Sequence, residues 1–591
     1  MKKLINKPES IVQDMCKGIA LAHPQLVLNQ KYRILLKKEL TPNKVSLISG
    51  GGSGHEPAHA GFIGTGMLDA AVCGDVFASP SQIQVYQAIQ EAASPKGVLL
   101  IIKNYSGDMM NFKNAAYLAQ EDGIDVDYVK VDDDIAVQDS LYTVGRRGVA
   151  GTVFIHKIAG AAAERGLSLT QVKEIALKTI SNVKTLGVAL TSCTVPAKGT
   201  PTFELGESEM EYGVGIHGEP GISKESIVSA KELADNVITS LCNELKLVDC
   251  NNERVAVLIN GFGATPLMEL YLLNKEIARE MNHRGINIAR SFVGNFMTSI
   301  DMAGASVSVL KLDDELEDLL NQPCITPAFR VDGPVPSVPY NLVQEIADEG
   351  EEDVAYGIET PDSYAVIQDT ITLSNMLYIV DTMCDVIIRN ETFFCELDSH
   401  AGDGDFGMSL ANGFRQLKRE WKTIISQPNL DIATFLNACS LIIMENCGGA
   451  SGPIWGSAFR AAGKYAAEKQ TLTVGEFAKM LQSAMQGIQN TGERSFGRGA
   501  VVGDKTLIDA LSPCVDAWLE IAREKGDFSN GFRLGTEAAV AGAKKTETFA
   551  ARMGRAGTVG ERSIGYPDAG AHALGVIFID ITNAIQNINN F

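Results

Sequence analysis

The chain has 591 residues, of which 45% are hydrophobic and 21% are charged. This length exceeds what one hydrophobic core covers and the composition is globular, so two to four folding units are expected and a disordered chain is excluded. The formal net charge of -21 argues against a nucleic-acid partner, because phosphate backbones require clustered Lys and Arg. It does not argue against a small anionic ligand.

Cysteine spacing and hydropathy bear on the cellular compartment. The eleven cysteines are widely spaced and include no C-x-x-C pair, which favours reduced thiols over a disulfide framework or a zinc site. The N-terminal residues lack the apolar segment of a signal peptide, and no run of eighteen apolar residues occurs. We therefore expect a soluble, cytoplasmic protein without a membrane partner.

Two apolar runs in the first half of the chain end in polar, glycine-rich segments. Residues 45–49 indicate a buried strand that leads into a glycine loop at 50–57. Residues 98–102 indicate a second strand, followed by Lys103 and Asp108. In open α/β sheets ligands bind at the carboxyl ends of the strands. The pattern therefore predicts an α/β domain with a ligand site at these ends.

Further elements of this domain follow from hydrophobic periodicity. Helical spacing is found at 10–40, 152–165 and 267–281, and strand candidates are found at 187–191 and 255–259.

The segment 213–218 matches G-x-G-x-x-G and contains His217. It follows an acidic stretch instead of a strand, and Pro220 blocks the helix that a Rossmann turn opens into. We reject a dinucleotide site there and keep His217 as a loop residue that a small ligand can approach closely. No Walker A loop occurs, so a nucleotide would be bound by another architecture.

A change in composition near residue 333 indicates a linker. Pro334, Pro336 and Pro339 are followed by an acidic stretch, which is typical of a flexible connection. Ala, Leu, Ile, Met and Gly at helical spacing then dominate the remainder of the chain. We expect an α/β domain of two subdomains at 1–332, a linker at 333–362 and an all-α domain at 363–591.

Asp398, Asp403 and Asp405 lie within eight positions of one another in the segment 397–407. Carboxylates this close repel one another unless a cation lies between them. Glycines at 402, 404 and 407 are expected to preclude a regular helix and to let the acids converge. Oxygen ligands suit Mg2+ or Ca2+, and Mg2+ keeps positions open for water or phosphate.

Three other interpretations apply to this acidic segment. It matches G-x-G-x-x-G, but a diphosphate would meet two acids there instead of bare amides. An EF-hand loop starting at Asp403 would require Gly and Glu where the chain has Met408 and Phe414. An exposed acidic turn stays open as the simpler alternative. The preferred hypothesis is a metal-phosphate site.

Four further glycine-rich loops occur in the helical domain. Each resembles an ordinary helix cap or turn. Together with the acidic segment they predict one rim that holds a polyphosphate and its metal. They span residues 448–453, 503–506, 554–557 and 567–570.

These motifs, in this order, resemble the dihydroxyacetone (glycerone) kinase family over nearly the whole chain. Segments resembling its substrate-binding domain are 49–57, 102–108, 132–134, 145–148, 193–196 and 213–221. Segments resembling its nucleotide-binding domain, a helical barrel, are 398–407, 448–453, 503–506, 560–565 and 568–570.

The resemblance implies roles for the substrate-side residues. His217 would hold a ketose covalently as a hemiaminal, which selects carbonyl compounds over polyols such as glycerol. His55 would be the general base toward the attacking hydroxyl, and Asp108 would hydrogen-bond the substrate and share the proton. The residues expected to position the substrate are Gly52, Ser53, Gly54 and Lys103.

The resemblance also implies that Asp398, Asp403 and Asp405 hold two Mg2+ ions on the nucleotide phosphates. The remaining nucleotide-binding positions would be Phe406, Gly407, Met408, Ser409, Ala450, Ser451, Gly499, Thr506, Leu507, Arg555, Asp568, Ala569 and Gly570. Split relatives recharge ADP from a phosphocarrier protein, whereas fused relatives use ATP directly. No segment remains for a phosphocarrier domain, so ATP is the expected donor.

Two features depart from the family pattern. Phe406 replaces a smaller or more polar residue, and the loop 492–503 is longer and more basic, with Arg494 and Arg498 available to a phosphate. Both leave the reaction class unchanged but leave dihydroxyacetone and the four-carbon erythrulose as alternative substrates.

Other functions also stay open. Fused relatives split FAD to a cyclic flavin phosphate at the same nucleotide site, and relatives of each domain act as ligand-sensing coregulators. A metal-stabilised structural protein would leave the five loops unexplained. Relatives are domain-swapped homodimers, so a homodimer is expected.

Overall fold

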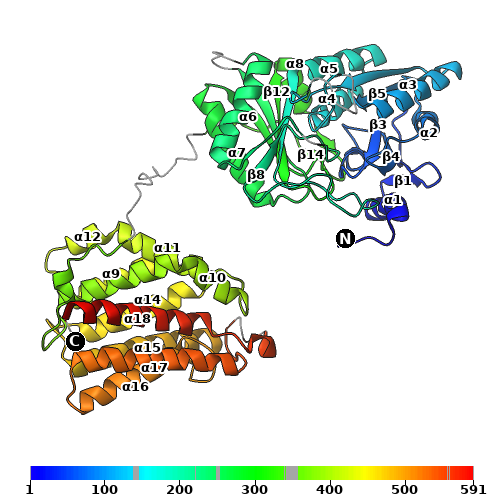
Figure 1. The fold of residues 1–591 in the computed structure, drawn as a ribbon. Helices are drawn as coiled ribbons and strands as arrows, with labels where there is room; N and C mark the ends of the chain where they lie inside the picture. Colours follow the sequence, from blue (N-terminus) through cyan, green and yellow to red (C-terminus); the bar gives the residue numbers. More distant parts are fainter. Residues whose placement is uncertain are drawn as a thin grey trace. The chain divides into compact units, whose positions relative to one another are not determined.

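The computed structural model describes residues 2–137, 145–219, 221–247, 253–338, 340, 357–554, 557 and 559–589. The chain divides into two compact units, Met1–Ala347 and Asp348–Phe591. Figure 1 shows an α/β arrangement in the first unit and a helical arrangement in the second.

The first unit contains a six-stranded sheet with the order β1-β2-β4-β3-β5-β6. β3 pairs in parallel with both β4 and β5, so the carboxyl ends of these three strands lie at one edge. The strands are β1 (Leu26–Asn29), β2 (Ile34–Lys37), β3 (Ser46–Ser53), β4 (Ala70–Val76), β5 (Val98–Lys103) and β6 (Val126–Val131).

Alternate side chains of this sheet face two different cores. On β5, Leu99 and Ile101 face the larger core, whereas Val98 and Leu100 pack with α2 (Gln82–Ala92) and α3 (Ser106–Glu121). A strand that is buried on both faces exposes neither set of alternating side chains to solvent. This burial explains why residues 98–102 are apolar without alternation.

A second sheet of the same unit has the order β11-β10-β12-β7-β8-β9. Its strands are β7 (Val183–Ala189), β8 (Glu209–Tyr212), β9 (Ser223–Ser226), β10 (Arg254–Gly261), β11 (Asn287–Gly294) and β12 (Gly304–Leu312). The helices α6 (Ala230–Leu245) and α7 (Leu267–His283) pack on one face. The connection between β8 and β9 carries His217.

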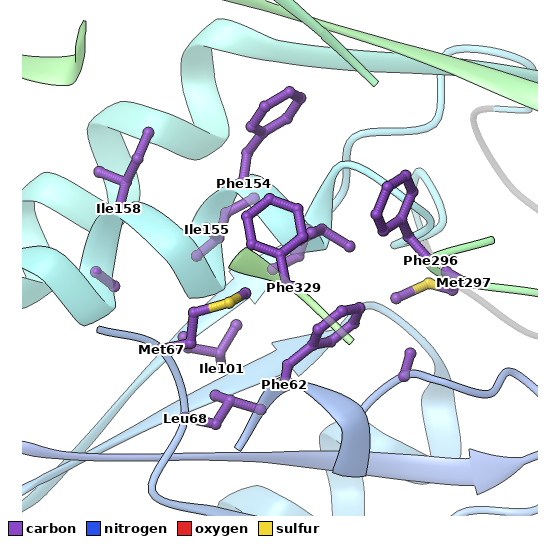
Figure 2. Close-up of a cluster of buried hydrophobic side chains, with 14 of the residues drawn as sticks. Phe62, Met67, Leu68, Ile101, Phe154, Ile155, Ile158, Phe296, Met297 and Phe329 are labelled. Carbon is purple, nitrogen blue, oxygen red and sulfur yellow. The ribbon is translucent and has the colours of Figure 1, made fainter. Parts of the chain in front are cut away.

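The helix α4 (Thr152–Glu164) ties the two sheets together. It packs against β3 and β5, and also against α5 (Leu169–Asn182) and α8 (Asp314–Leu320), which contact β12. Figure 2 shows Phe154 of this helix in one cluster with Phe62, Ile101, Phe296 and Phe329. The shared core makes the two sheets one unit. A short hairpin of β13 (Cys324–Ile325) and β14 (Arg330–Val331) completes it.

The structure confirms most predicted elements of this unit, places the strand predicted at 187–191 slightly earlier as β7, and corrects one helix. The strands at 98–102 and 255–259 and the helices at 152–165 and 267–281 correspond to β5, β10, α4 and α7.

The predicted helix at 10–40 is wrong beyond Ala22. The helix α1 (Ile11–Ala22) ends there, and β1 and β2 form an antiparallel pair at the edge of the first sheet. Pro24 cannot continue a helix, and the apolar runs on either side of the following turn are short enough for strands.

The described part of the second unit is built from helices. They are α9 (Leu373–Arg389), α10 (Glu391–Ser399), α11 (Phe406–Arg419), α12 (Trp421–Ile425), α13 (Ile432–Asn446), α14 (Ser451–Ala466), α15 (Val474–Phe496), α16 (Ile508–Arg523), α17 (Phe528–Lys545) and α18 (Ala569–Asn589). Each of α13 to α17 packs on the next helix, and α18 packs on α9. The ring of helices closes into the predicted barrel (Figure 1), whose interior contains an apolar cavity of 150 Å³.

A buried ion pair holds the first described residues of the helical unit. Lys418 and Asp381, both fully buried, pair with each other. Lys418 Nζ also donates to the carbonyl oxygen of Gly357 at 2.6 Å, and Asp381 Oδ2 accepts from the amides of Glu359 and Thr360, each at 2.7 Å. Gly357, Glu359 and Thr360 belong to the predicted linker at 333–362. Residues 339 and 341–356 of this linker lie outside the described residues. The domain limits stay a prediction.

Among the described cysteines, all are free thiols and all but Cys395 are buried. None of the described helices combines the length and the apolar character needed to cross a membrane.

Candidate functional site

The carboxyl ends of β3 and β5 bring Lys103 and the glycine loop together. Lys103 ends β5, is fully buried and has its Nζ 3.5 Å from Oδ2 of Asp108, which lies in the first turn of α3. A Cβ at Gly51 would lie 2.6 Å from this Nζ. A side chain at this position would therefore force the ammonium group to move.

His55 and His217 meet although 162 positions separate them. Their Nε2 atoms are 3.2 Å apart, and His55 Nδ1 lies 2.8 Å from the carbonyl oxygen of Thr298. A carbonyl only accepts, so His55 Nδ1 carries the proton and its Nε2 is the acceptor. His217 then donates to His55 through Nε2.

Both imidazoles are neutral at neutral pH. Burial lowers the pKa of His217 to about 3, with the charges of Lys103 and Arg147 adding to the effect. Burial, and then the nearby His217 and Lys103, lower the pKa of His55 well below its ordinary 6.5. A buried cation beside an ammonium group is unfavourable, so the pair is held in its unprotonated form.

A cavity of 430 Å³ lies beside the His217 ring. Tyr105 contacts this ring edge-on with 4.4 Å between centroids, and Phe77 stacks on His55 at 5.2 Å. The lining residues are Gly52, Phe77, Ser79, Tyr105, Ser106, Gly107, Asp108 and His217. Hydroxyl, carboxylate and imidazole groups on an aromatic wall suit a small polar molecule.

The predicted substrate-side residues fall into three places. Gly52, Asp108 and His217 line the cavity, while His55 and Lys103 contact these lining residues from behind. Ser53 and Gly54 instead line a separate cavity of 370 Å³. Ser53 Oγ there donates to the carbonyl oxygen of Gly74 at 2.7 Å.

Sequence reasoning missed Phe77 and Tyr105. Phe77 has a left-handed φ of 57°. No sequence pattern near Phe77 predicts this backbone conformation. Tyr105 stands between Lys103 and Asp108 in a segment already singled out, so its place between two predicted site residues was an available signal.

The three aspartates of the helical unit converge as predicted. Asp398 lies in the last turn of α10, and Asp403 and Asp405 precede α11. One carboxylate oxygen from each lies within 4.8 Å of the others. Burial, and then the charges of Asp403 and Asp405, raise the pKa of Asp398. An all-oxygen donor set of this charge fits Mg2+.

The glycines of this segment act differently from the prediction. Gly404 takes a left-handed φ of 77°, and its amide donates to Asp398 Oδ2 at 2.9 Å. Gly407 does not preclude a helix, because α11 begins at Phe406. A Cβ at Gly407 would lie 2.0 Å from the carbonyl oxygen of Glu391. Close helix packing therefore explains this glycine.

Four helices begin at one cavity of 210 Å³ next to these aspartates. Phe406, Ser451 and Ala569 are the first residues of α11, α14 and α18, and Leu507 precedes α16; all four line the cavity. First-turn amides lack helical partners, and the helix dipole favours an anion there. Converging N-termini beside a cation site suit a metal-bound polyphosphate.

Most predicted nucleotide-binding residues line this cavity. They are Phe406, Ala450, Ser451, Thr506, Leu507, Asp568, Ala569 and Gly570, together with Asp398, Asp403 and Asp405. Gly407, Met408, Ser409 and Gly499 lie outside the lining. Arg555 lies outside the described residues.

The cavity also contains a lysine that the sequence analysis did not single out. Lys505 is buried and lines the cavity, and its Nζ donates to the carbonyl oxygens of Ser563 at 2.6 Å and Phe549 at 3.1 Å. Beside it, burial raises the pKa of Asp568 to about 7. Lys505 stands inside the predicted loop 503–506, which was a usable signal.

The predicted loop 492–503 is shorter than expected, because α15 extends to Phe496 and includes Arg494. Both arginines of this segment are engaged within the protein. Arg498 forms an ion pair with Asp504, with Nη2 to Oδ1 at 3.0 Å. Arg494 Nη2 donates to Thr491 Oγ1 at 2.9 Å. Neither arginine lines the 210 Å³ cavity.

Comparison with known proteins gives a family match for each unit. Residues 17–328 match the Dak1 domain and residues 400–583 match the DAK2 domain. The putative 3,4-dihydroxy-2-butanone kinase of Solanum lycopersicum is 36% identical over 97% of this chain and 96% of its own length. L-erythrulose 1-kinase of Mycolicibacterium smegmatis is 33% identical over 98% of both chains. Triokinase/FMN cyclase of Mus musculus is 32% identical over 99% of both.

A solved structure extends the similarity to the fold. The crystal structure of the dihydroxyacetone kinase from C. freundii in complex with AMP-PNP and Mg2+ is 31% identical, with a TM-score of 0.57. The match covers 98% of this chain and 99% of that chain. With both domains in one chain and relatives aligned along its whole length, the chain belongs to the fused dihydroxyacetone kinase family.

Proposed function

We propose that this enzyme phosphorylates a terminal hydroxyl of dihydroxyacetone with ATP, giving dihydroxyacetone phosphate. As a family member the chain is an ATP-dependent kinase of short ketoses, and the proposal adds the substrate and the residue roles. The observation that carries it is the division of chemistry between two sites. A neutral imidazole pair in a small polar cavity suits a carbonyl compound, and a carboxylate triad beside helix N-termini suits a metal-bound polyphosphate.

His217 holds the ketose covalently in this proposal. A ring nitrogen adds to the carbonyl carbon, the carbonyl π electrons move to the oxygen, and the imidazole proton ends on that oxygen. The product is a neutral hemiaminal. The lowered pKa of His217 supports this role, because only an unprotonated imidazole is a nucleophile. Glycerol has no carbonyl and cannot be held in this way.

His55 takes the proton from the attacking hydroxyl. Its Nε2 carries the lone pair because the carbonyl oxygen of Thr298 accepts from Nδ1. In the free protein this lone pair accepts from His217. Hemiaminal formation removes the His217 imidazole proton, which leaves the lone pair free to act as a general base. Asp108 hydrogen-bonds the substrate and shares the proton. Gly52 and Lys103 position the ketose. Ser53 and Gly54 line the separate cavity and would act only through the backbone of the glycine loop.

Asp398, Asp403 and Asp405 would hold the metal, and we propose two Mg2+ ions. When bound, such ions neutralise the charge on the phosphate oxygens. Ser451, Thr506 and Asp568 line the same cavity and would contact the nucleotide beside the first turns of the helices.

Two second activities have specific support. A relative of similar length is named L-erythrulose 1-kinase, and a four-carbon ketose carries the same carbonyl chemistry. Another is named triokinase/FMN cyclase, which supports FAD splitting at the helical site without His217. A ligand-sensing coregulator is the non-enzyme alternative and would need no turnover at either site.

We also propose that the chain forms a homodimer in the cytoplasm. Four apolar residues of α7, Leu267, Met268, Tyr271 and Leu272, are each more than half exposed. Apolar side chains gathered on one helix are typical of an interface, and a second copy is the proposed partner. Light scattering should give a dimer mass for the native chain and a monomer mass for Tyr271→Lys. A monomeric native chain would overturn this proposal.

The function is tested by ADP release from Mg-ATP with dihydroxyacetone, erythrulose, glyceraldehyde and glycerol in turn. We expect turnover on a short ketose, none on glycerol, and loss of ketose turnover in His217→Ala. His283→Ala is the control, because that side chain is 81% exposed. FAD consumption without ketose turnover would favour the cyclase, and no reaction at all would favour the sensor.

A further inference from the structure

The family-like segments 132–134 and 145–148 meet the His217 loop in a buried ion network. Arg147 Nε donates to Asp134 Oδ2 at 2.6 Å, and its Nη1 donates to Glu219 Oε1 at 3.2 Å. Its Nη2 donates to the carbonyl oxygen of Gly213 at 2.8 Å. All three charged side chains are buried. One guanidinium group thus serves three acceptors inside the protein.

Glu219 connects this guanidinium to the backbone of His217. Its Oε2 accepts from the His217 amide at 2.8 Å, while Oε1 accepts from Arg147. Because Arg147 also holds the carbonyl oxygen of Gly213, both ends of the segment that carries His217 depend on one side chain.

The loop closes tightly around this ion pair. A Cβ at Gly215 would lie 1.9 Å from Glu219 Oε1 and 2.7 Å from Arg147 Nη1. The His217 ring itself is bounded by Tyr105 and by one nitrogen contact with His55. These ring contacts limit where the imidazole lies, but they do not fix the backbone from which it extends.

We propose that Arg147 and Glu219 form a clamp that positions His217 for addition to the ketose carbonyl. The inference rests on the proposed covalent role of His217. Neither residue lines the substrate cavity, so both are positioning residues. Addition needs the nitrogen within about 3–3.5 Å of the carbonyl carbon in a narrow range of directions. A small shift of the loop therefore weakens ketose capture while the fold persists.

Glu219→Gln is the main test, because the amide keeps the size and one acceptor but loses the charge. Glu244→Gln is the matched control. Glu244 pairs with the neighbouring Arg146 at 2.7 Å, at a partly exposed position, and has no described hydrogen bond to the His217 loop. For each protein the KM values for dihydroxyacetone and for Mg-ATP are measured. The hemiaminal is measured by carbon-13 NMR of dihydroxyacetone labelled at its carbonyl.

For Glu219→Gln we expect the KM for dihydroxyacetone to rise about tenfold, the typical cost of a lost charged hydrogen bond. The protein-dependent signal of the tetrahedral carbon should weaken in parallel. The KM for Mg-ATP should not change, and Glu244→Gln should match the native chain in every measurement. Arg147→Lys should act in the same direction, because one ammonium group cannot serve three acceptors in the plane of a guanidinium.

Two outcomes would overturn the clamp. One is a native hemiaminal signal and ketose KM in Glu219→Gln. The other is that both variants lose ketose capture only as they lose cooperative thermal unfolding, because a merely structural contact would do the same. A native chain that phosphorylates dihydroxyacetone without any hemiaminal signal would instead overturn the covalent role of His217. The covalent role of His217 is therefore tested on the native protein, without any variant.

Discussion

The two candidate sites solve opposite electrostatic problems. In the α/β unit, burial keeps His55 and His217 neutral, so the site is ready for a carbonyl compound without added charge. In the helical unit, burial and neighbouring carboxylates raise the pKa of Asp398, and burial raises that of Asp568 to about 7. Lys505 is the one positively charged residue among the described lining residues, against four aspartates, so the site has excess negative charge until a cation binds. Carbonyl addition requires an uncharged nucleophile, and phosphoryl transfer requires neutralisation of phosphate charge. The residues suited to each lie in separate units.

Removing one carboxylate should break the helical site alone. Asp403→Asn is expected to lower turnover at least about a thousandfold, because the cation loses a charged oxygen ligand. The hemiaminal signal on His217 should persist. Asp431→Asn is the control, since Asp431 caps α13 through the Thr434 amide and Asn caps equally well. Loss of the hemiaminal in Asp403→Asn would contradict the separation.

The buried ion pair should matter for the helical unit only. Lys418→Met leaves Asp381 buried without its partner, which costs about 3–5 kcal/mol of unfolding free energy. All three tryptophans, Trp421, Trp455 and Trp518, lie in this unit. Urea unfolding followed by tryptophan fluorescence therefore reports on it selectively.

Lys469→Met is the matched control for Lys418→Met. Its pair with Glu476 is about one-third exposed on both sides, so little or no change in the unfolding free energy is expected. Equal effects of the two substitutions would show that burial of the first pair is unimportant.

The proposed base and nucleophile should be separable within the α/β unit. His55→Gln is expected to lower kcat about a hundredfold, within the usual range of general-base catalysis, while the hemiaminal still forms on His217. Single-turnover phosphorylation with saturating ketose measures the chemical step. A variant that loses the hemiaminal as well would assign His55 to substrate capture.

Acid should destabilise the α/β unit through its buried histidines. Burial lowers the pKa of His55, His59, His156 and His217 below the unfolded value of about 6.5. The unfolded state therefore binds more protons below that pH, and stability falls as pH falls, by about 1.4 kcal/mol per pH unit for each histidine.

Hydrogen exchange measured by mass spectrometry reports each unit separately and checks this dependence. In His156→Gln the dependence of the unfolding free energy on pH, measured between pH 6 and pH 4, should be smaller by the contribution of one histidine, about 1.4 kcal/mol per pH unit. An unchanged slope would mean that His156 takes up its proton in the folded state.

The sequence predicted the architecture well where local pattern decides structure. Residues 98–102 are apolar on consecutive positions because β5 is buried on both faces, and this marks them as a strand. Asp398, Asp403 and Asp405 are close in sequence, so their convergence was foreseeable from spacing alone. The helix expected at 10–40 failed because its second half repeats apolar residues in runs that suit two short strands.

The features that the sequence pattern did not predict depend on contacts between residues far apart in the chain. The approach of His55 to His217 depends on two sheets joined by α4. The spacing of these residues in the sequence does not predict this contact. Phe77 reaches the cavity through a left-handed backbone conformation. Lys505 and Tyr105 stood within recognised segments, but their burial against the sites became visible only with the fold.

Gly215 links the Arg147–Glu219 contact to the evolutionary freedom of the loop. Any side chain at this position would meet Glu219 within 1.9 Å, so a substitution there is tolerated only if the carboxylate withdraws. Among divergent homologues, Gly215 should therefore be replaced only in sequences that have also changed Glu219 or Arg147. Gly215, Glu219 and Arg147 are therefore expected to change together among homologues.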